Sequence, residues 1–142
     1  MKILKYIFIV AAFVFVREEG KAQCSPTESV KVCIPKLAGG FNFLKSYEIN
    51  GRGGRLEKVE YSYPFAKGTQ YMVNLCSSEG ENKGLVVTLY DSSRKQLATS
   101  VVNGQHVSAI VFTCQSTGIY YITYTFDNST QYCGGSALGF KR

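Results

Sequence analysis

The chain has little of what catalysis usually requires. Among its 142 residues there is a single histidine, His106, and no tryptophan. A serine or cysteine nucleophile generally depends on a base that a third group holds in place. His106 comes shortly after the turn-forming pair Asn103-Gly104, and Asp91 or Asp127 would have to reach it from elsewhere to complete a triad with Ser108. The sequence therefore predicts a protein that is not an enzyme.

Other absences bear on metal sites, membranes and domain count. No two cysteines have the C-x-x-C spacing of a zinc site or a redox dithiol. The apolar run from Tyr6 to Val16 has eleven residues, whereas a membrane helix needs about 20. There is no internal repeat, low-complexity tract or linker, and no segment with a convincing helical period. With 45% apolar residues, the chain is expected to form one domain with a real core.

The first residues have the pattern of a signal peptide. Two lysines precede the apolar run, and Gly20 and Ala22 are the small residues that a signal peptidase inspects. We expect cleavage after Ala22, which makes residues 1–22 the signal peptide and places the protein in the periplasm, at the cell surface or outside the cell. The alternatives are a retained anchor and a lipid on Cys24. The residues before Cys24 lack the expected small and apolar pattern, and no membrane span is expected after cleavage.

Export changes how charge and cysteines are interpreted. Residues 1–22 hold four of the 16 basic and two of the 10 acidic side chains, so the mature chain keeps twelve and eight, a net charge of +4. This mild excess does not indicate nucleic-acid binding, and the single Gly51-Arg52-Gly53-Gly54-Arg55 segment is expected to be a glycine-rich hairpin with solvated arginines. In an oxidising compartment we expect two disulfides and one free thiol. The pairing is open, although Cys24 with Cys33 is one candidate. The cysteines are Cys24, Cys33, Cys76, Cys114 and Cys133.

From residue 41 onward, apolar residues recur at every second position between turn signals. The pattern predicts about eight strands and an all-β fold of two packed antiparallel sheets, a jelly-roll-like β-sandwich over residues 41–142, with a barrel as the alternative. Residues 23–40 are expected to form an irregular N-terminal arm. In the first strand Phe41, Phe43, Tyr47 and Ile49 share one parity, which Lys45 breaks.

The stretch FTCQSTGIYYITYTF, residues 112–126, is unusually rich in tyrosine. Tyr120, Ile122, Tyr124 and Phe126 alternate with a second set that includes Tyr121. A central strand that is half-buried on both sides explains this composition without any catalytic demand. We therefore expect these residues to have a structural role. The functional alternative is that Tyr121, together with Tyr61 or Tyr63, presents an aromatic platform to a sugar ring or a peptide.

Three segments within residues 63–126 carry a family resemblance: YPFAKGTQYMVNL, LVVTLYDSSRKQLATS and IVFTCQSTGIYYITYT. In this order they resemble the bacterial pre-peptidase C-terminal domain, over a little under half of the chain. The resemblance implies a small β-sandwich accessory domain of secreted proteins that binds polymers or assists secretion. Where that family often has an acidic pair suited to calcium, this chain has Lys83-Gly84. The matching positions, all architectural, are Phe65, Gly68, Tyr71, Leu89, Tyr90, Asp91, Gly118, Tyr120 and Tyr121.

Charged residues give two further candidate sites. Arg52 and Arg55, with Lys58, form an anion-attracting strip if Arg94 and Lys95 lie nearby. A weak structural calcium ion is the only cofactor expected, because carboxylates occur at loop positions without a dense D-x-D spacing. Its candidate ligands are Glu79, Glu81, Asp91 and Asp127.

These observations favour an exported, non-catalytic β-sandwich that binds a glycan or an envelope protein at the cell surface. One alternative is a small carbohydrate-active hydrolase that uses Glu79 or Glu81 with Asp91. Another is a structural envelope component whose spare cysteine bonds a partner chain. The oligomeric state is left open.

Overall fold

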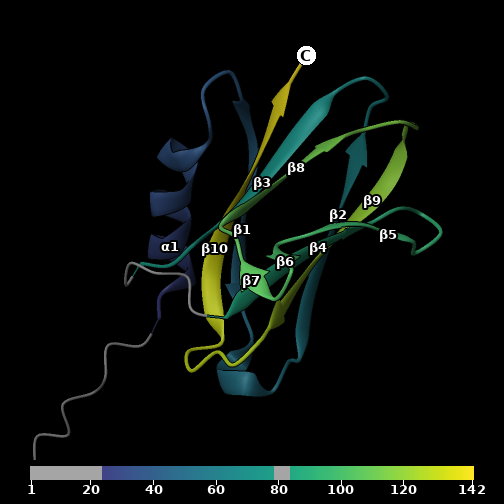
Figure 1. Ribbon diagram of the computed structural model, residues 1–142. Helices are drawn as coiled ribbons and strands as arrows, with labels where there is room; N and C mark the ends of the chain where they lie inside the picture. The colour runs from purple at the N-terminus through teal and green to yellow at the C-terminus, as the bar shows by residue number, and fades with distance from the viewer. Residues whose placement is uncertain (1–23, 79–83) are drawn as a thin grey trace, which may run out of the picture.

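The computed structural model describes residues 24–78 and 84–142. The predicted signal peptide and the carboxylates Glu79 and Glu81 lie outside the described residues. Two antiparallel four-stranded sheets pack face to face, and one helix lies on the outer side of the first sheet (Figure 1). Among the described residues, no helix is both long and apolar enough to cross a membrane.

The order of the strands is that of a jelly roll. In spatial order, sheet A contains β1 (Asn42–Asn50), β10 (Cys133–Lys141), β3 (Gln70–Cys76) and β8 (Ala109–Thr113). Sheet B contains β2 (Lys58–Phe65), β9 (Gly118–Phe126), β4 (Leu85–Tyr90) and β5 (Gln96–Thr99). A small hairpin pairs β6 (Val101–Val102) with β7 (Gln105–His106). The helical segments are α1 (Pro26–Cys33) and the 3₁₀ turns η1 (Ile34–Lys36) and η2 (Arg52–Gly54). With the eight long strands numbered along the chain, the sheets read 1-8-3-6 and 2-7-4-5, which confirms the predicted jelly-roll-like sandwich.

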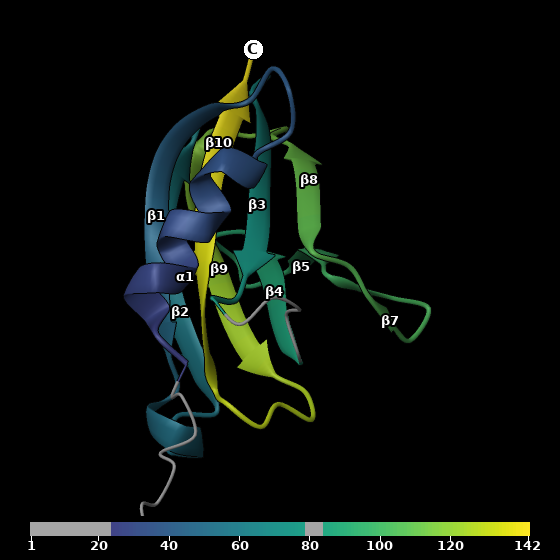
Figure 2. The ribbon, with the colours of Figure 1, turned by 90° about the vertical axis from the view of Figure 1, so that its left-hand side faces the viewer.

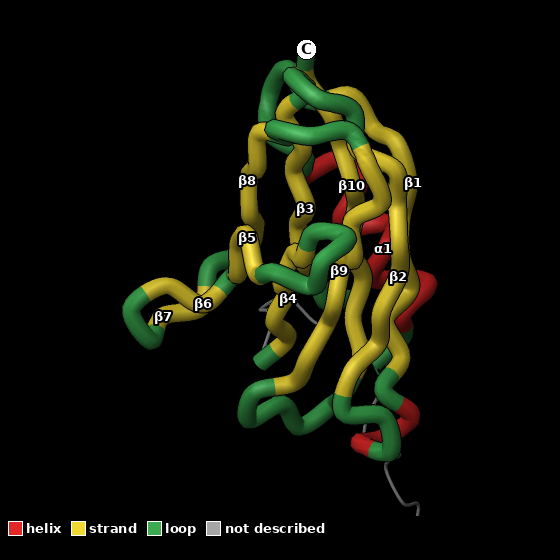
Figure 3. The backbone as a smooth tube through the Cα atoms, turned by 90° about the vertical axis from the view of Figure 1, so that its right-hand side faces the viewer, coloured by secondary structure: helices red, strands yellow, loops and turns green. Residues whose placement is uncertain are grey.

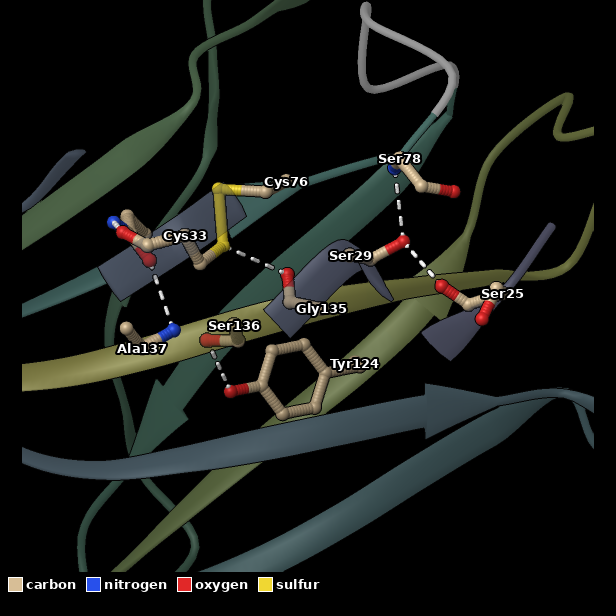
Figure 4. The surroundings of a disulfide bond; sticks show 10 residues. Ser25, Ser29, Cys33, Cys76, Ser78, Tyr124, Gly135, Ser136 and Ala137 are labelled. Atoms are coloured by element: carbon tan, nitrogen blue, oxygen red, sulfur yellow. Dashed lines mark hydrogen bonds between the residues drawn. A yellow bond between two sulfur atoms is a disulfide. The ribbon is translucent and has the colours of Figure 1, made fainter. Parts of the chain in front are cut away.

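The core lies between the two sheets and contains one face of the tyrosine-rich stretch. Tyr120, Ile122 and Tyr124 of β9 are buried, at most 5% exposed, whereas Tyr121 lies on the other face of the strand. The hydroxyl of Tyr124 donates to Ser136 Oγ of β10 at 2.7 Å and so joins the two sheets (Figure 4). The inward-facing residues of the stretch are scaffold, as predicted.

The alternation breaks near the start of β1. Phe43 pairs with Gly139 and Lys45 with Leu138, which leaves Leu44 as an extra residue in the register. This irregularity is a β-bulge, which changes the face that the following residues occupy. Leu44 therefore packs against the core, while Phe43 is 46% exposed. Phe43 therefore does not share the buried face of Tyr47 and Ile49, although the three residues have the same parity.

The arm over residues 23–40 was expected to be irregular, but it contains the helix α1. Ser25 caps this helix, because its Oγ accepts a hydrogen bond from the backbone N–H of Glu28 at 3.3 Å, and Pro26 occupies the first turn. A serine followed three residues later by glutamate is a helix-start pattern, and proline is well suited to the first helical position. The local signal was present, but the helix of eight residues is too short to show a clear period.

Helix α1 packs on the outer face of sheet A, over β10 (Figure 2). The close approach requires Gly135, since a Cβ there would lie 2.4 Å from Val30 N and 2.5 Å from the carbonyl carbon of Ser29. Buried Asn74 of β3 links the two layers. Its Nδ2 donates to the carbonyl of Cys33 at 2.9 Å, and its Oδ1 accepts from Ala137 N at 2.8 Å.

Two disulfides attach α1 to sheet A, and one thiol stays free. Cys24 pairs with Cys133, and Cys33 pairs with Cys76 (Figure 4). The predicted count is confirmed, but the candidate pairing of Cys24 with Cys33 is wrong, because both residues bond to strands instead of to each other. The free thiol belongs to Cys114, which is 1% exposed. Its burial also contradicts the idea that a spare cysteine bonds a partner chain.

Candidate functional site

The aromatic platform predicted from Tyr61, Tyr63 and Tyr121 does not form. In the antiparallel pairing of β2 and β9, Tyr63 lies opposite Tyr120 and Ser62 lies opposite Tyr121. Opposed residues share a face of the sheet, so Tyr61 and Tyr63 pack against the core while Tyr121 points away from it. Tyr61 is further held by its hydroxyl, which donates to the carbonyl of Glu48 at 2.6 Å.

The outer face of sheet B instead carries a hollow of about 240 Å³. Strand register aligns its residues in rows that cross the sheet: Glu60 of β2 lies opposite Thr123 of β9, and Thr123 lies opposite Thr88 of β4. The next row pairs Lys58 with Thr125. Hydroxyls and charged groups thus share one surface. The residues that line the hollow are Lys58, Glu60, Tyr90, Arg94, Thr123 and Thr125.

Arg94 reaches this face from the turn between β4 and β5. Asp91 Oδ1 accepts from the backbone N–H groups of Ser93 and Lys95, each at 2.9 Å, and Arg94 adopts a left-handed φ of 64°. The turn directs the guanidinium over the ring of Tyr121, with Cζ 3.7 Å from the ring centroid. An arginine in this position gains a cation–π contact and leaves its N–H groups free to donate in the plane.

Glu60 completes the cluster. Arg94 Nη1 lies 2.8 Å from both carboxylate oxygens of Glu60, and Thr123 Oγ1 donates to Glu60 Oε2 at 2.8 Å. Burial is the largest influence on the pKa of Glu60 and raises it. The hydrogen bonds from Arg94 and Thr123, with the charges of Arg94 and Lys58, outweigh burial and hold the pKa below its usual value. We call Glu60, Arg94, Tyr121 and Thr123 the Glu60–Arg94 cluster.

A second hollow, of about 490 Å³, opens between β1 and β2 at the edge of the sandwich. Arg52 lines it, and Lys58 and Glu60 line both hollows. Lys58 thus shares one hollow with Arg52 and the other with Arg94, but the carboxylates of Glu48 and Glu60 interrupt the predicted basic strip. Arg55 follows on the same loop and is exposed, but it lines neither hollow.

The two predicted calcium ligands among the described residues, Asp91 and Asp127, do not converge. Asp91 directly follows β4, whereas Asp127 N donates to the carbonyl of Gly84, which precedes β4. The six residues of β4 separate these two positions by about 20 Å. The carboxylate of Asp91 also accepts hydrogen bonds from backbone N–H groups of its own turn. Within residues 24–78 and 84–142, no three His, Cys, Asp or Glu side chains gather in a way that could hold a metal ion.

His106 does meet a carboxylate. Its Nε2 lies 3.1 Å from Asp127 Oδ2, and the two side chains are 37% and 55% exposed. One of the two aspartates proposed from the sequence thus reaches the histidine, but on an open surface. The tyrosines fill the core and do not line a cleft around this pair. The buried thiol of Cys114 lies instead beside the Ser116 carbonyl, at 3.2 Å, and the Tyr120 hydroxyl, at 3.4 Å.

Sequence reasoning missed the pairing of Glu60 with Arg94. The two residues are 34 positions apart, and Glu60 by itself has the pattern of an ordinary solvent-facing charge on a strand. The available signal in the sequence was the predicted strip of arginines and lysines. That prediction included Arg94 only if it lies near the other basic residues. Thr123 and Tyr90 carried no signal beyond alternation.

Comparisons with known proteins add little. No family model matches the chain, and no curated protein matches it. Among solved structures, PliG, a periplasmic lysozyme inhibitor of g-type lysozyme from Aeromonas hydrophila, aligns at 10% identity with a TM-score of 0.47, over 75% of this chain and 92% of that chain. A similarity this weak gives no information about the function of this chain. The resemblance of residues 63–126 to the pre-peptidase C-terminal domain stays a prediction from its motifs.

Proposed function

We propose that the protein is an exported, non-catalytic binding module that holds a glycan on the outer face of sheet B. The observation that carries the proposal is the Glu60–Arg94 cluster. It is a carboxylate, a guanidinium, a hydroxyl and an aromatic ring that contact one another beside a hollow of about 240 Å³. Groups held in place before binding lose little conformational freedom when a ligand arrives.

The composition of this face favours a polyhydroxylated ligand. Carboxylates accept hydrogen bonds and guanidinium groups donate them, so Glu60 and Arg94 match both roles of a sugar hydroxyl. The hydroxyls of Thr125 and Tyr90 serve as either donor or acceptor, whereas the hydroxyl proton of Thr123 is already donated to Glu60. The face of the Tyr121 ring is covered by Arg94, so the contact is expected to rely on hydrogen bonds more than on stacking of a sugar against the ring.

Export is supported by the leader-like N-terminus and by the two disulfides, which persist in oxidising compartments. Binding instead of catalysis is supported by the engagement of these carboxylates in other hydrogen bonds, since Glu60 is bonded to Arg94 and Asp91 to its own turn. A structural calcium ion remains a proposal that depends on Glu79 and Glu81, outside the described residues.

The test is a panel of cell-surface glycans titrated by calorimetry against the disulfide-bonded mature chain. Arg94→Ala and Glu60→Gln are expected to weaken binding by about tenfold or more, because each removes charge-assisted hydrogen bonds. Glu28→Gln is the matched control. It removes another surface ion pair, Glu28 with Lys31 at 2.7 Å on α1, and should bind as wild type. Folded protein that binds no glycan, or binding that survives Arg94→Ala, would refute the proposal. Capture of an envelope protein by the same face would replace the glycan with a protein ligand.

A further inference from the structure

The four edge strands of the sandwich differ in how they are protected. The edges are β1 and β8 in sheet A and β2 and β5 in sheet B. Proteins discourage strand addition at an edge with charges, proline, bulges or very short strands. Strand β2 has Lys58, Glu60 and Pro64, β1 has a bulge and Lys45, and β5 has four residues with a shifted register.

Strand β8 has none of these protections. Its sequence, AIVFT, contains no charge and no proline. It pairs with β3 in unbroken register from Gln70 opposite Thr113 to Asn74 opposite Ala109. Its other edge pairs with no strand of the described chain. An uncharged edge strand with no register shift and an open side is a site where another strand adds.

Helix α1 and the segment after it cover the outer face of sheet A, and this covered area also ends before β8. Met72 of β3 is 7% exposed, and its sulfur accepts a hydrogen bond from Ala38 N at 3.4 Å, so the segment after α1 reaches as far as β3. Val111, which lies opposite Met72 on β8, is 50% exposed. The open edge therefore comes with an uncovered β-branched side chain.

We propose that a second copy of this chain adds to this edge, with the two β8 strands antiparallel about a twofold axis at Val111. The segment is complementary to itself in this register, since Ala109 meets Thr113 of the partner subunit and Ile110 meets Phe112 of the partner subunit. Every facing pair is uncharged, and Val111 meets its own copy. The pairing satisfies the edge N–H and C=O groups and joins the two A sheets into one.

The β6–β7 hairpin supplies the second part of this interface. A pair of five-residue strands buries less than the roughly 1,200 Å² that a stable interface needs. The hairpin projects from the body on the side of β8 (Figures 2 and 3). It carries Val102, 51% exposed, and the adjoining Val107 is 40% exposed. These apolar side chains are placed to contact the flank of the second copy.

Engineered cysteines test the geometry directly. On the twofold axis, the two Val111 Cβ atoms would lie about 5 Å apart, close to the separation that a disulfide spans. Val111→Cys is therefore expected to give a covalent dimer on mild oxidation in non-reducing electrophoresis. Ile119→Cys is the matched control, because Ile119 is 45% exposed but lies on the central strand β9, which has neighbours on both sides. Wild type, with Cys114 buried, sets the background.

Sedimentation of the unmodified full chain gives the second readout. Wild type is expected to show a concentration-dependent dimer, and Val111→Lys to be monomeric with an unchanged circular dichroism spectrum, because two facing lysines repel each other. Monomeric wild type at high concentration, or equal cross-linking of Val111→Cys and Ile119→Cys, would overturn the proposal. Wild type that stays monomeric and binds a different protein through the β8 edge would overturn it as well. None of these outcomes depends on glycan binding, so this proposal and the proposed function fail separately.

Discussion

At the scale of single residues, two buried tyrosines on facing strands give opposite expectations. Tyr124 is fully buried, and its hydroxyl donates to Ser136 Oγ at 2.7 Å. Tyr47 is 2% exposed, and its hydroxyl has no hydrogen-bond partner among the described residues. A buried polar group with a partner contributes to stability, whereas one without a partner costs free energy. The same substitution should therefore have different effects at the two sites.

Tyr124→Phe is expected to lower the free energy of unfolding by about 1 to 2 kcal/mol, because it removes the hydrogen bond and leaves Ser136 Oγ buried without that donor. Tyr47→Phe is expected to change it by less than about 0.5 kcal/mol or to stabilise the protein. Urea unfolding followed by circular dichroism measures both. Equal losses in the two variants would show that the Tyr47 hydroxyl has a partner in solution.

The buried tyrosines also predict the behaviour at high pH. Burial raises the pKa of Tyr124 and Tyr47, and burial followed by the contact with Cys114 raises that of Tyr120 to about 12. In the unfolded chain the pKa is about 10. Their contribution to stability is therefore complete below about pH 10 and is lost as the pH rises toward 12. Tyrosinate absorbance of these residues should appear together with loss of the β-sheet signal. Their ionisation in a fully folded protein near pH 10 would contradict this.

At the scale of elements, the contact between α1 and β10 depends on a missing side chain. Gly135→Ala would force a Cβ to within 2.4 Å of Val30 N, and the helix cannot move away freely, because disulfides at Cys24 and Cys33 attach both of its ends to sheet A. We expect a loss of about 1 to 3 kcal/mol, as for other overpacked sites. Gly118→Ala in β9 is the control. A Cβ there meets nothing within 4 Å, so its urea midpoint should match wild type. A Gly135→Ala midpoint equal to that of Gly118→Ala would show that the helix is not held closely in solution.

Period-two burial was enough to predict the strands, because alternation is a local property of the chain. Lys45 broke the pattern visibly, yet alternation alone could not distinguish an inward-facing lysine from the bulge at Leu44. Helix α1 was missed because its evidence is the cap formed by Ser25 and Glu28, not a period. The Glu60–Arg94 cluster depends on a turn that places Arg94 across two strands, which no local pattern encodes.

At the scale of the whole molecule, the two proposals have a common consequence. A twofold axis perpendicular to the joined A sheets would leave both B sheets on the same side of the dimer, so both Glu60–Arg94 clusters would face the same way. Two sites that engage one polymer bind more tightly than either alone, without any new contact. The open face of sheet B and the open edge of β8 would then serve separate roles in one assembly.

The disulfides are expected to supply a large share of the stability of the described chain. Cys24–Cys133 and Cys33–Cys76 join residues 109 and 43 positions apart. By loop entropy they contribute about 5 and 4 kcal/mol, within a measured range of about 2 to 5 for natural disulfides. Replacing Cys33 and Cys76 together by alanine should lower the free energy of unfolding by an amount in this range. The variant without Cys24 and Cys133 should lose a similar or larger amount. Urea unfolding measures both losses. As a control, thiol titration of each denatured variant should find one free thiol, that of Cys114. A loss below about 1 kcal/mol in both variants would show that the jelly-roll core alone holds the fold, and that α1 is an accessory to it.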